Sequence, residues 1–484
     1  MYKKNVLLKF FLLFYIFLSG FSRAEVSQAD ETTLGAVELI LSPHPDNSLM
    51  VNASVVTASN ARVAIRFNSA DTERRRTAYT DFGTDHNRVV LGLRSDTTYQ
   101  FTAVAVFESG EKVLSEAVEF KTGPQPTGVP EVNLLAKNEQ GEGGLTVFAP
   151  SGNTGSTFWG FDEEGELVWY LHGDLPATGT KIARNLHDGR LLLLLSGEAR
   201  TISFTGETLS SIELPPYHHD ALLLENGHIL LLSNETETIN GTLLQGDAII
   251  ELDTQGNIVW EWSAFDHLDT GRFPGDLAAR VLPNGALDWT HSNALHYIAE
   301  DDSILLSSRS QSWVVSIDHK SGEINWIMGR DSVVSKELSE KLFALDNGSW
   351  MASQHAAMKT GDGEILVYDN RNESELSGDI YNSRAVKFRL DTETMSAEQT
   401  WEFVAPKYTA SLGDVDELIG GNILICAGGP GSASTGGDRN AHLIEVTSGD
   451  IPETAWEVEV VDTTIYRAER VSWAELLGRS SGNN

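Results

Sequence analysis

The chain has 484 residues, 41% of them hydrophobic and 8% aromatic, so it is long enough for about three domains and excludes wholesale disorder. Asp and Glu number 69 against 35 Lys and Arg, and the resulting net charge of −34 excludes nucleic acid as a partner, because phosphate binding needs a basic face. The single cysteine, Cys426, excludes an intrachain disulfide and a cysteine-based zinc site.

Residues 1–24 have the three parts of a secretory signal peptide. A basic start is followed by an apolar stretch over residues 6–21 and by a small-residue motif that ends at Ala24. We expect cleavage after Ala24, export of the protein, and no membrane association of the mature chain. An uncleaved anchor helix is the alternative, although Lys9 interrupts the apolar run.

Residues 35–122 predict a small N-terminal β-sandwich. Short runs that alternate apolar and polar residues, such as RVAIRF and TYQFTAVAVF, are separated by turn residues. The string LGLRSDTTYQFTAVAV resembles the signature of a fibronectin type III or immunoglobulin-like domain, and nothing in this segment indicates chemistry. Residues 123–134 are rich in Pro and Gly at their start and predict a linker.

Residues 135–484 repeat two phrases. The first is a turn followed by Gly-x-x-x-Trp; it ends at Trp169, Trp260 and Trp326, with copies lacking the Gly at Trp401 and Trp456 and a copy lacking the Trp near Gly206. The second is a polar residue, an apolar strand, a turn and another apolar strand: residues 219–234 align without a gap on residues 355–370, and residues 291–309 and 413–429 are looser copies. Repeated all-β units of this size predict a β-propeller, and the six Trp phrases predict six blades.

Three equivalent repeat positions carry histidine: His219, His291 and His355. The innermost strands of a propeller line its axis, so residues at one phase of several repeats converge there. A lone histidine is most often structural, but three at one phase favour a shared site. His218 should point to the opposite strand face from His219, and the sequence leaves open which of the two faces the axis. Four other histidines are interpreted as structural: His187, His228, His296 and His319.

Two further polar residues accompany His291. Asn293 lies two residues on and shares its strand face, and Arg309 follows the partner strand. The planar fork of an arginine suits a tetrahedral oxyanion, so this group favours anion binding over a metal. The alternative is that Arg309 pairs with a structural carboxylate such as Asp288. Because the sequence has no Gly-x-Ser-x-Gly motif and no plausible cysteine nucleophile, imidazole is the best nucleophile available.

Four strings of this sequence resemble the bacterial arylsulfate sulfotransferase family: DWTHSNALHY, DSILLSSRSQSWVVSI, SWMASQHAAM and SRAVKFRLDTETMSAEQTWEF. The resemblance covers roughly residues 135–480 and implies a six-bladed propeller in the periplasm. It further implies transfer of a sulfuryl group from an aryl sulfate to a phenol, without a nucleotide sulfate donor or any other cofactor. The implied route is a ping-pong reaction through a sulfated histidine, and some family members are dimers.

The resemblance also implies roles for five residues. His355, in the SQHAA phrase, corresponds to the nucleophile, while His291, Asn293 and Arg309 correspond to the residues that hold the sulfuryl oxygens. The HHD phrase supplies a further catalytic histidine, best assigned to His219. The chain departs from the family in its single cysteine, because some members carry a disulfide.

Two alternatives to a sulfotransferase remain open from the sequence. An aryl sulfatase would use the same covalent intermediate with water as the acceptor, and the two differ in how well the channel excludes water. An exported, non-catalytic propeller that binds a glycan or a protein is the other, since fold alone does not define function. The sequence predicts neither the physiological donor nor the acceptor.

Overall fold

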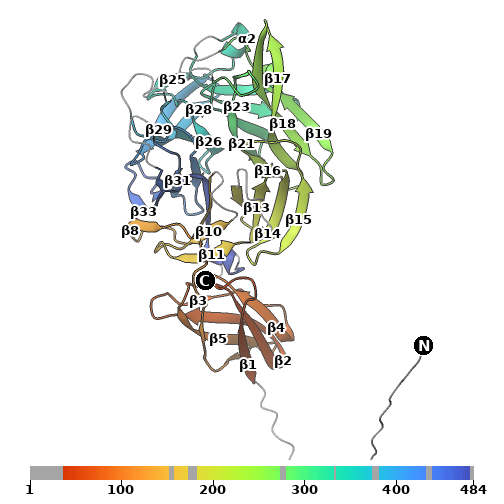
Figure 1. Ribbon diagram of the computed structural model, residues 1–484, viewed down its shortest axis with the longest axis vertical. Coiled ribbons are helices and arrows are strands. Elements are labelled where there is room, and N and C mark those ends of the chain that lie inside the picture. The colour runs from red at the N-terminus through yellow and green to blue at the C-terminus, as the bar shows by residue number, and fades with distance from the viewer. Residues whose placement is uncertain are drawn as a thin grey trace, which may run out of the picture.

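The computed structural model describes residues 36–151, 157–172, 182–272, 280–331, 334–372, 381–431 and 439–479. The predicted signal peptide, residues 1–24, lies outside these ranges. Within them the chain is almost entirely β, and no helix is long and apolar enough to cross a membrane. Figure 1 shows a ring of small sheets with a separate β domain below it.

The N-terminal domain is built around one long strand. Its strands are β1 (Val37–Pro43), β2 (Val51–Asn68), β3 (Arg75–Arg76), β4 (Gly83–Val90), β5 (Thr98–Phe107), β6 (Lys112–Leu114) and β7 (Val118–Lys121). The first part of β2 pairs with β1 and β4, and its second part pairs with β3 and β5, which in turn pairs with β6 and β7. Apolar side chains from both parts of β2, including Val55 and Phe67, share one core. The fibronectin-like topology stays a prediction.

Six sheets form the propeller, and this confirms the predicted number of blades. Blade 1 contains β9 (Leu145–Pro150), β10 (Phe158–Phe161), β11 (Leu167–Leu171) and the C-terminal β34 (Ile465–Val471). Blade 2 contains β12 (Ile182–Asn185), β13 (Arg190–Leu195), β14 (Glu198–Ser203) and β15 (Thr208–Glu213). Blade 3 contains β16 (Ala221–Leu223), β17 (Ile229–Ile239), β18 (Thr242–Leu252), β19 (Ile258–Ser263) and the short β20 (Leu287–Asp288).

Blade 4 contains β21 (Ser292–Ile298), β22 (Ser303–Ser308), β23 (Trp313–Asp318) and β24 (Ile324–Gly329). Blade 5 contains β26 (His355–Lys359), β27 (Ile365–Asp369), β28 (Arg384–Asp391), β29 (Ser396–Val404) and the added β25 (Ala344–Asn347). Blade 6 contains β30 (Asp414–Glu417), β31 (Ile423–Ala427), β32 (Ala441–Val446), β33 (Thr454–Val460) and the N-terminal β8 (Val132–Lys137). Short helices α1 (Ala264–His267), α2 (Lys336–Ser339) and α4 (Trp473–Leu476) lie outside the sheets.

The two ends of the propeller sequence close the ring in two places. The C-terminal β34 pairs with β9 as the inner strand of blade 1, and β8 pairs with β33 at the outer edge of blade 6. β8 begins at Val132, so the segment predicted as a linker over residues 123–134 already enters blade 6 at its end. Closure by both chain ends ties residues distant in sequence into single sheets.

The repeated tryptophans lie in outer strands, where they join neighbouring blades. Trp169 Nε1 in β11 donates to the Phe204 carbonyl of blade 2 at 2.8 Å. Trp401 Nε1 in β29 donates to the Gly449 carbonyl of blade 6 at 3.1 Å. A buried indole needs a partner for its N–H, and the turn of the next blade supplies it. Trp456 makes the same contact with the Glu163 carbonyl of blade 1 at 3.0 Å, and in blade 3 it is the neighbouring Trp262 that donates, to the Gly322 carbonyl of blade 4 at 3.0 Å.

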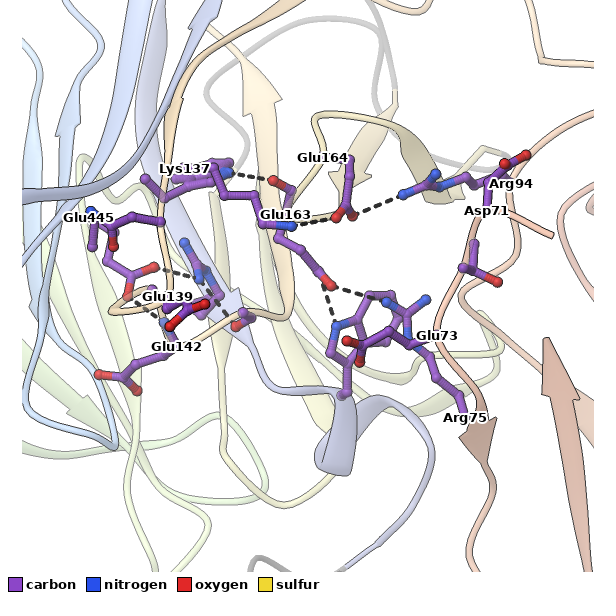
Figure 2. A pocket seen from close by; sticks show the side chains of 18 residues that line it. Asp71, Glu73, Arg75, Arg94, Lys137, Glu139, Glu142, Glu163, Glu164 and Glu445 are labelled. Atoms are coloured by element: carbon purple, nitrogen blue, oxygen red, sulfur yellow. Dashed lines mark hydrogen bonds and ion pairs between the residues drawn. The ribbon is translucent and has the colours of Figure 1, made fainter. Parts of the chain in front are cut away.

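The N-terminal domain docks on blade 1 through charged side chains that line a cavity of about 360 Å³. Arg94 pairs with the buried Asp162 at 2.6 Å, and Arg75 pairs with Glu163 at 3.1 Å. The Arg75 guanidinium also lies 3.4 Å from the ring centroid of Trp473 in α4 (Figure 2). The interface therefore joins the first domain to the C-terminal helix as well as to the propeller.

Candidate active site

The three predicted histidines lie at the same end of three inner strands. His219 directly precedes β16, His291 directly precedes β21, and His355 is the first residue of β26. The ring centroids of His219 and His291 are 5.0 Å apart, and Tyr466 of β34 lies 6.0 Å from His219 and 6.1 Å from His355. The propeller thus brings the three imidazoles together around Tyr466 at one end of its axis.

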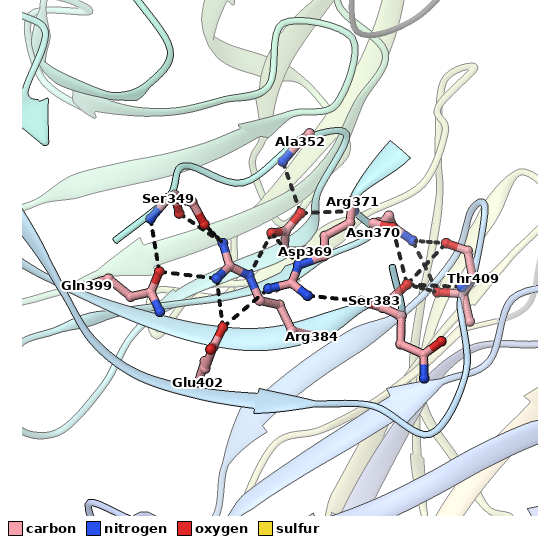
Figure 3. A network of polar contacts seen from close by, with 11 residues as sticks. Ser349, Ala352, Asp369, Asn370, Arg371, Ser383, Arg384, Gln399, Glu402 and Thr409 are labelled. Carbon is pink, nitrogen blue, oxygen red and sulfur yellow. Dashed lines mark hydrogen bonds and ion pairs between the residues drawn. The ribbon is translucent and has the colours of Figure 1, made fainter. Parts of the chain in front are cut away.

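His355 is held as a neutral imidazole with a defined tautomer. Its Nδ1 lies 2.7 Å from Asn370 Oδ1. Asn370 Nδ2 donates to the Leu412 carbonyl at 3.0 Å and to the Thr409 carbonyl at 2.9 Å, and Figure 3 shows Asn370 beside Thr409. Because the amide nitrogen faces those carbonyls, the amide oxygen faces the ring, and His355 carries its proton on Nδ1. Burial, and then the charge of Arg309, hold the pKa of His355 well below its ordinary value.

The second ring nitrogen of His355 is therefore the free base. Nε2 accepts only one long hydrogen bond, from the Leu412 N–H at 3.3 Å. An unprotonated imidazole nitrogen that is buried and oriented by its partner is suited to nucleophilic attack. The geometry therefore gives His355 the properties of a nucleophile. It can act as one only while its imidazole is neutral.

Arg309 is a half-buried cation that makes no direct ion pair with a carboxylate among the described residues. Its Nη2 donates to the Ala410 carbonyl at 3.3 Å, and its buried Nε has no hydrogen-bond partner there. Burial lowers the pKa of its guanidinium from the usual value, and the charge of Asp288 opposes this shift. Direct pairing with Asp288 is wrong, because Asp288 Oδ2 instead lies 2.6 Å from His291 Nδ1. A guanidinium with a buried, unpartnered N–H is suited to bind an anion.

Asn293 lies beside the nucleophile. Its Nδ2 donates to the Gln354 carbonyl at 2.8 Å, and its Oδ1 is buried without a partner. The Tyr466 hydroxyl donates to the Asn293 carbonyl at 2.9 Å. The Gln354 carbonyl thus takes one N–H of Asn293 Nδ2, and the second N–H of Nδ2 is the group that can donate to an anionic ligand, because Oδ1 is an acceptor.

The expectation that His218 and His219 face opposite sides is wrong. Both line one cavity of about 580 Å³, and their Nδ1 atoms lie 2.8 Å apart. The cause is the backbone at His219, whose φ of +56° leaves the extended conformation and ends the alternation of side chains. His219 contacts His291, whereas His218 lies behind it with Nε2 3.2 Å from Asp247 Oδ1.

The rest of this cavity is largely apolar. Its wall is formed by side chains of blades 1 and 2 and of the loops before blades 3 and 6: Ile182, Leu214, Pro215, Pro216, Tyr217, Leu412 and Tyr466. Tyr217 is fixed by a hydrogen bond from its hydroxyl to the Leu195 carbonyl at 2.7 Å. An apolar wall next to a cationic and imidazole-rich floor fits a ligand with a flat ring and an anionic group.

A layer of buried charges lies one or two residues further along the inner strands. Arg184 pairs with Asp220 at 2.6 Å, and the carboxyls of Asp414, Asp416 and Glu469 lie within 4.8 Å of one another. Burial and the neighbouring Asp416 raise the pKa of Glu469 to about 7. Among the described residues, Asp414, Asp416 and Glu469 are the group whose carboxyl oxygens lie close enough together to hold a cation. None of the three lines the cavity that contains His218 and His219.

Four residues of the site were not predicted as functional from the sequence: Asn370, Asp247, Tyr466 and Leu412. Only Asn370 carried a signal, because it ends the phrase that aligns without a gap on His219–Asn234. The others reach the site through sheet closure or through loops, and no spacing in the sequence reveals that. Three of the four histidines interpreted as structural have carboxylate partners elsewhere: His187 contacts Glu475, His228 lies 2.6 Å from Glu251, and His319 contacts Glu251 and Asp302.

A propeller whose axis holds a neutral buried histidine beside an unpaired arginine defines an anion-binding centre with a built-in nucleophile. The family model described as Arylsulfotransferase (ASST) matches residues 131–467. This range takes in the six blades except the end of β34, and it contains His219, His291, Asn293, Arg309 and His355. The chain belongs to the arylsulfotransferase family.

Two curated relatives carry the name arylsulfate sulfotransferase AssT. The one from Escherichia coli is 23% identical over 316 residues and the one from Lelliottia amnigena is 22% identical over 324 residues; each alignment covers 50% of this chain and 52% of the relative. The chain thus spans about half the length of the curated relatives it matches. A solved structure of a protein of unknown function from Bacteroides caccae aligns over 67% of this chain and 98% of its own at 14% identity, with a TM-score of 0.42.

Proposed function

We propose that this protein is an arylsulfate sulfotransferase that works through a sulfated His355. The observation that carries the proposal is the unprotonated Nε2 of a neutral, buried His355, near Arg309, which makes no direct ion pair with a carboxylate among the described residues. The family supports the chemical class of the transferred group. The apolar wall beside Tyr217 supports an aryl donor and a phenolic acceptor.

In the first half-reaction, His355 Nε2 attacks the sulfur atom of the aryl sulfate. The new N–S bond forms as the bond between sulfur and the aryl oxygen breaks, and the phenol leaves after its oxygen takes a proton from His219. Arg309, Asn293 and His291 donate to the three equatorial oxygens of the sulfuryl group, where charge develops. Asp288 holds His291 by its Nδ1 and so directs its Nε2 away from the carboxylate.

In the second half-reaction, a phenolic acceptor occupies the same apolar wall and attacks the sulfohistidine. His219 takes the proton of the acceptor hydroxyl, the S–N bond breaks, and neutral His355 is restored. Both half-reactions use one site, so ping-pong kinetics follow, and no cofactor takes part. We place the mature protein in the periplasm after removal of residues 1–24.

Product analysis tests the proposal against a sulfatase and a binding propeller. Purified protein is mixed with 4-nitrophenyl sulfate, with and without excess phenol, and both nitrophenolate and phenyl sulfate are measured. We expect steady turnover only with phenol, together with one phenyl sulfate for each nitrophenolate. Turnover that is independent of phenol and yields inorganic sulfate would indicate a sulfatase. No release from any of several aryl sulfates would contradict both enzymatic assignments.

A further inference from the structure

Behind the candidate site, three side chains form a continuous chain of contacts. Asp247 Oδ1 lies 3.2 Å from His218 Nε2, and His218 Nδ1 lies 2.8 Å from His219 Nδ1. His219 lines the cavity, and its ring centroid lies 5.0 Å from that of His291. The chain runs from a fully buried carboxylate in β18 to the ring that faces the substrate space.

The two histidines in this chain have opposite protonation preferences. Although burial opposes it, the contact with Asp247 raises the pKa of His218. Burial, and then the neighbouring His291 and His218, hold the pKa of His219 well below its ordinary value. Contacts with His218, with the Thr290 hydroxyl and with a backbone N–H outweigh burial and lower the pKa of Asp247 to about 2. These shifts favour a protonated His218 beside the Asp247 carboxylate and a neutral His219 next to it, with the His218–Asp247 contact an ion-pair contact without hydrogen-bond geometry.

These states fix the direction of the contact between the two rings. A protonated His218 donates from Nδ1, so Nδ1 of the neutral His219 accepts and its own proton sits on Nε2. That proton is the one available to a leaving oxygen in the cavity. His219 alone could give it up only by becoming an imidazolate, which is unfavourable in a buried site.

We propose that His218, paired with Asp247, stores the proton that His219 passes to and from the substrate oxygens. As the phenol leaves, its oxygen takes the Nε2 proton of His219 while His219 Nδ1 takes the Nδ1 proton of His218. When the acceptor phenol attacks, the same two transfers run in reverse, and the protein ends with the protons it began with. His218 does not contact the substrate; it acts through His219, to which it supplies the proton and from which it takes the proton back.

The proposal rests on the proposed function and deepens it. A phenol has a pKa near that of tyrosine, about 10, so an unprotonated phenolate is a poor leaving group. The requirement for a proton is much weaker for 4-nitrophenolate, whose charge is delocalised into the nitro group. Removal of the proton store should therefore slow the first half-reaction more when the leaving oxygen is more basic.

The test compares two donors in three variants of the full chain. The rate of the first half-reaction is measured without acceptor, as the burst of phenol released from phenyl sulfate and of nitrophenolate released from 4-nitrophenyl sulfate. The variants are His218→Gln, Asp247→Asn and the control His228→Gln. His228 lies in the same blade and forms a comparable pair with Glu251 at 2.6 Å, but away from the site.

We expect His218→Gln to slow the phenyl sulfate burst about 10²–10³-fold and the 4-nitrophenyl sulfate burst less than about 10-fold. Asp247→Asn should change the two donors in the same unequal way, and His228→Gln should leave both rates unchanged. A merely structural role for His218 would slow both donors equally. An equal loss, or no loss, in a folded His218→Gln variant would overturn the proton store.

A second measurement does not depend on turnover. Imidazole ¹⁵N shifts of the wild-type protein at pH 7 should show His218 protonated on both nitrogens, and Asp247→Asn should remove that state. A neutral His218 in the wild-type protein would overturn the proposal even if sulfuryl transfer were intact. Conversely, wild-type protein that releases no phenol from any aryl sulfate would overturn the proposed function, and the proton store with it.

Discussion

Replacement of Arg309 by lysine probes whether the buried cation binds the sulfuryl oxygens. Arg309→Lys keeps the charge but loses the planar fork, which can donate two parallel hydrogen bonds. In the free protein the Nε of Arg309 is unpartnered and its Nη2 makes one long bond of 3.3 Å, so the fork is available to a ligand. Loss of a single donor to a developing oxyanion costs about 10²–10³-fold in kcat. We expect a loss of that size in kcat, with a much smaller change in KM.

The same structure predicts that activity and stability change in opposite directions at this position. A half-buried cation whose Nε has no hydrogen-bond partner is unfavourable for folding, so Arg309→Met should raise the free energy of unfolding by about 1 kcal/mol while abolishing transfer. Inorganic sulfate should raise the melting temperature of the wild-type protein and leave that of Arg309→Met unchanged, since a ligand stabilises only the state that binds it.

Stopped-flow bursts with 4-nitrophenyl sulfate give the rates, and denaturant unfolding with and without sulfate gives the stabilities. Wild-type turnover in Arg309→Lys would refute the donor role. A large loss of stability in Arg309→Met would refute it as well, because it would show that the guanidinium has a structural counter-charge.

Three further predictions concern other parts of the molecule. Asp288→Asn should lower kcat/KM for the aryl sulfate about 10–100-fold by releasing His291 Nδ1, and steady-state kinetics with the folded variant check this. The pKa of Glu469 is raised to about 7, so the stability that its protonated form contributes is present below pH 4.5 and is lost as the pH rises through 7. Glu469→Gln should therefore be as stable as wild type at pH 4 and more stable at pH 8, by up to about 3 kcal/mol. Equal unfolding curves of the two proteins at pH 8 would contradict this. Gly92 has a φ of +76°, and a Cβ there would lie 2.7 Å from the Trp473 ring, so Gly92→Ala should loosen the N-terminal domain and speed its proteolysis without abolishing transfer.

The propeller was predictable because the same short pattern of strands and turns recurs along residues 135–484. In blades 1, 5 and 6 the tryptophan of the phrase makes the same contact with the next blade, through Trp169, Trp401 and Trp456. The histidines were predictable as a group because one phase of several inner strands meets at one axis. Loop contacts and ring closure, which bring Leu412 and Tyr466 to His355, depend on the whole fold and leave no mark in local spacing.

The relation between His218 and His219 shows where the sequence argument fails physically. Alternation of side chains holds only while the backbone is extended, and the left-handed φ of His219 breaks it at the residue that matters. His291 has a similar φ of +44°, so the same conformation recurs where a second blade meets the site. A residue other than glycine adopts a positive φ at a cost in conformational free energy, and contacts in the surrounding sheets must offset that cost.

The central claim is that the sulfuryl group passes through His355, and the most direct measurement is the mass of the protein itself. The wild-type chain is incubated with 4-nitrophenyl sulfate and no acceptor, its intact mass is recorded under non-acidic conditions, and the modified peptide is mapped. The account predicts one added sulfuryl group per chain, located on His355, lost on addition of phenol and absent in His355→Gln. An adduct on another residue, or full transfer to phenol by His355→Gln, would contradict it.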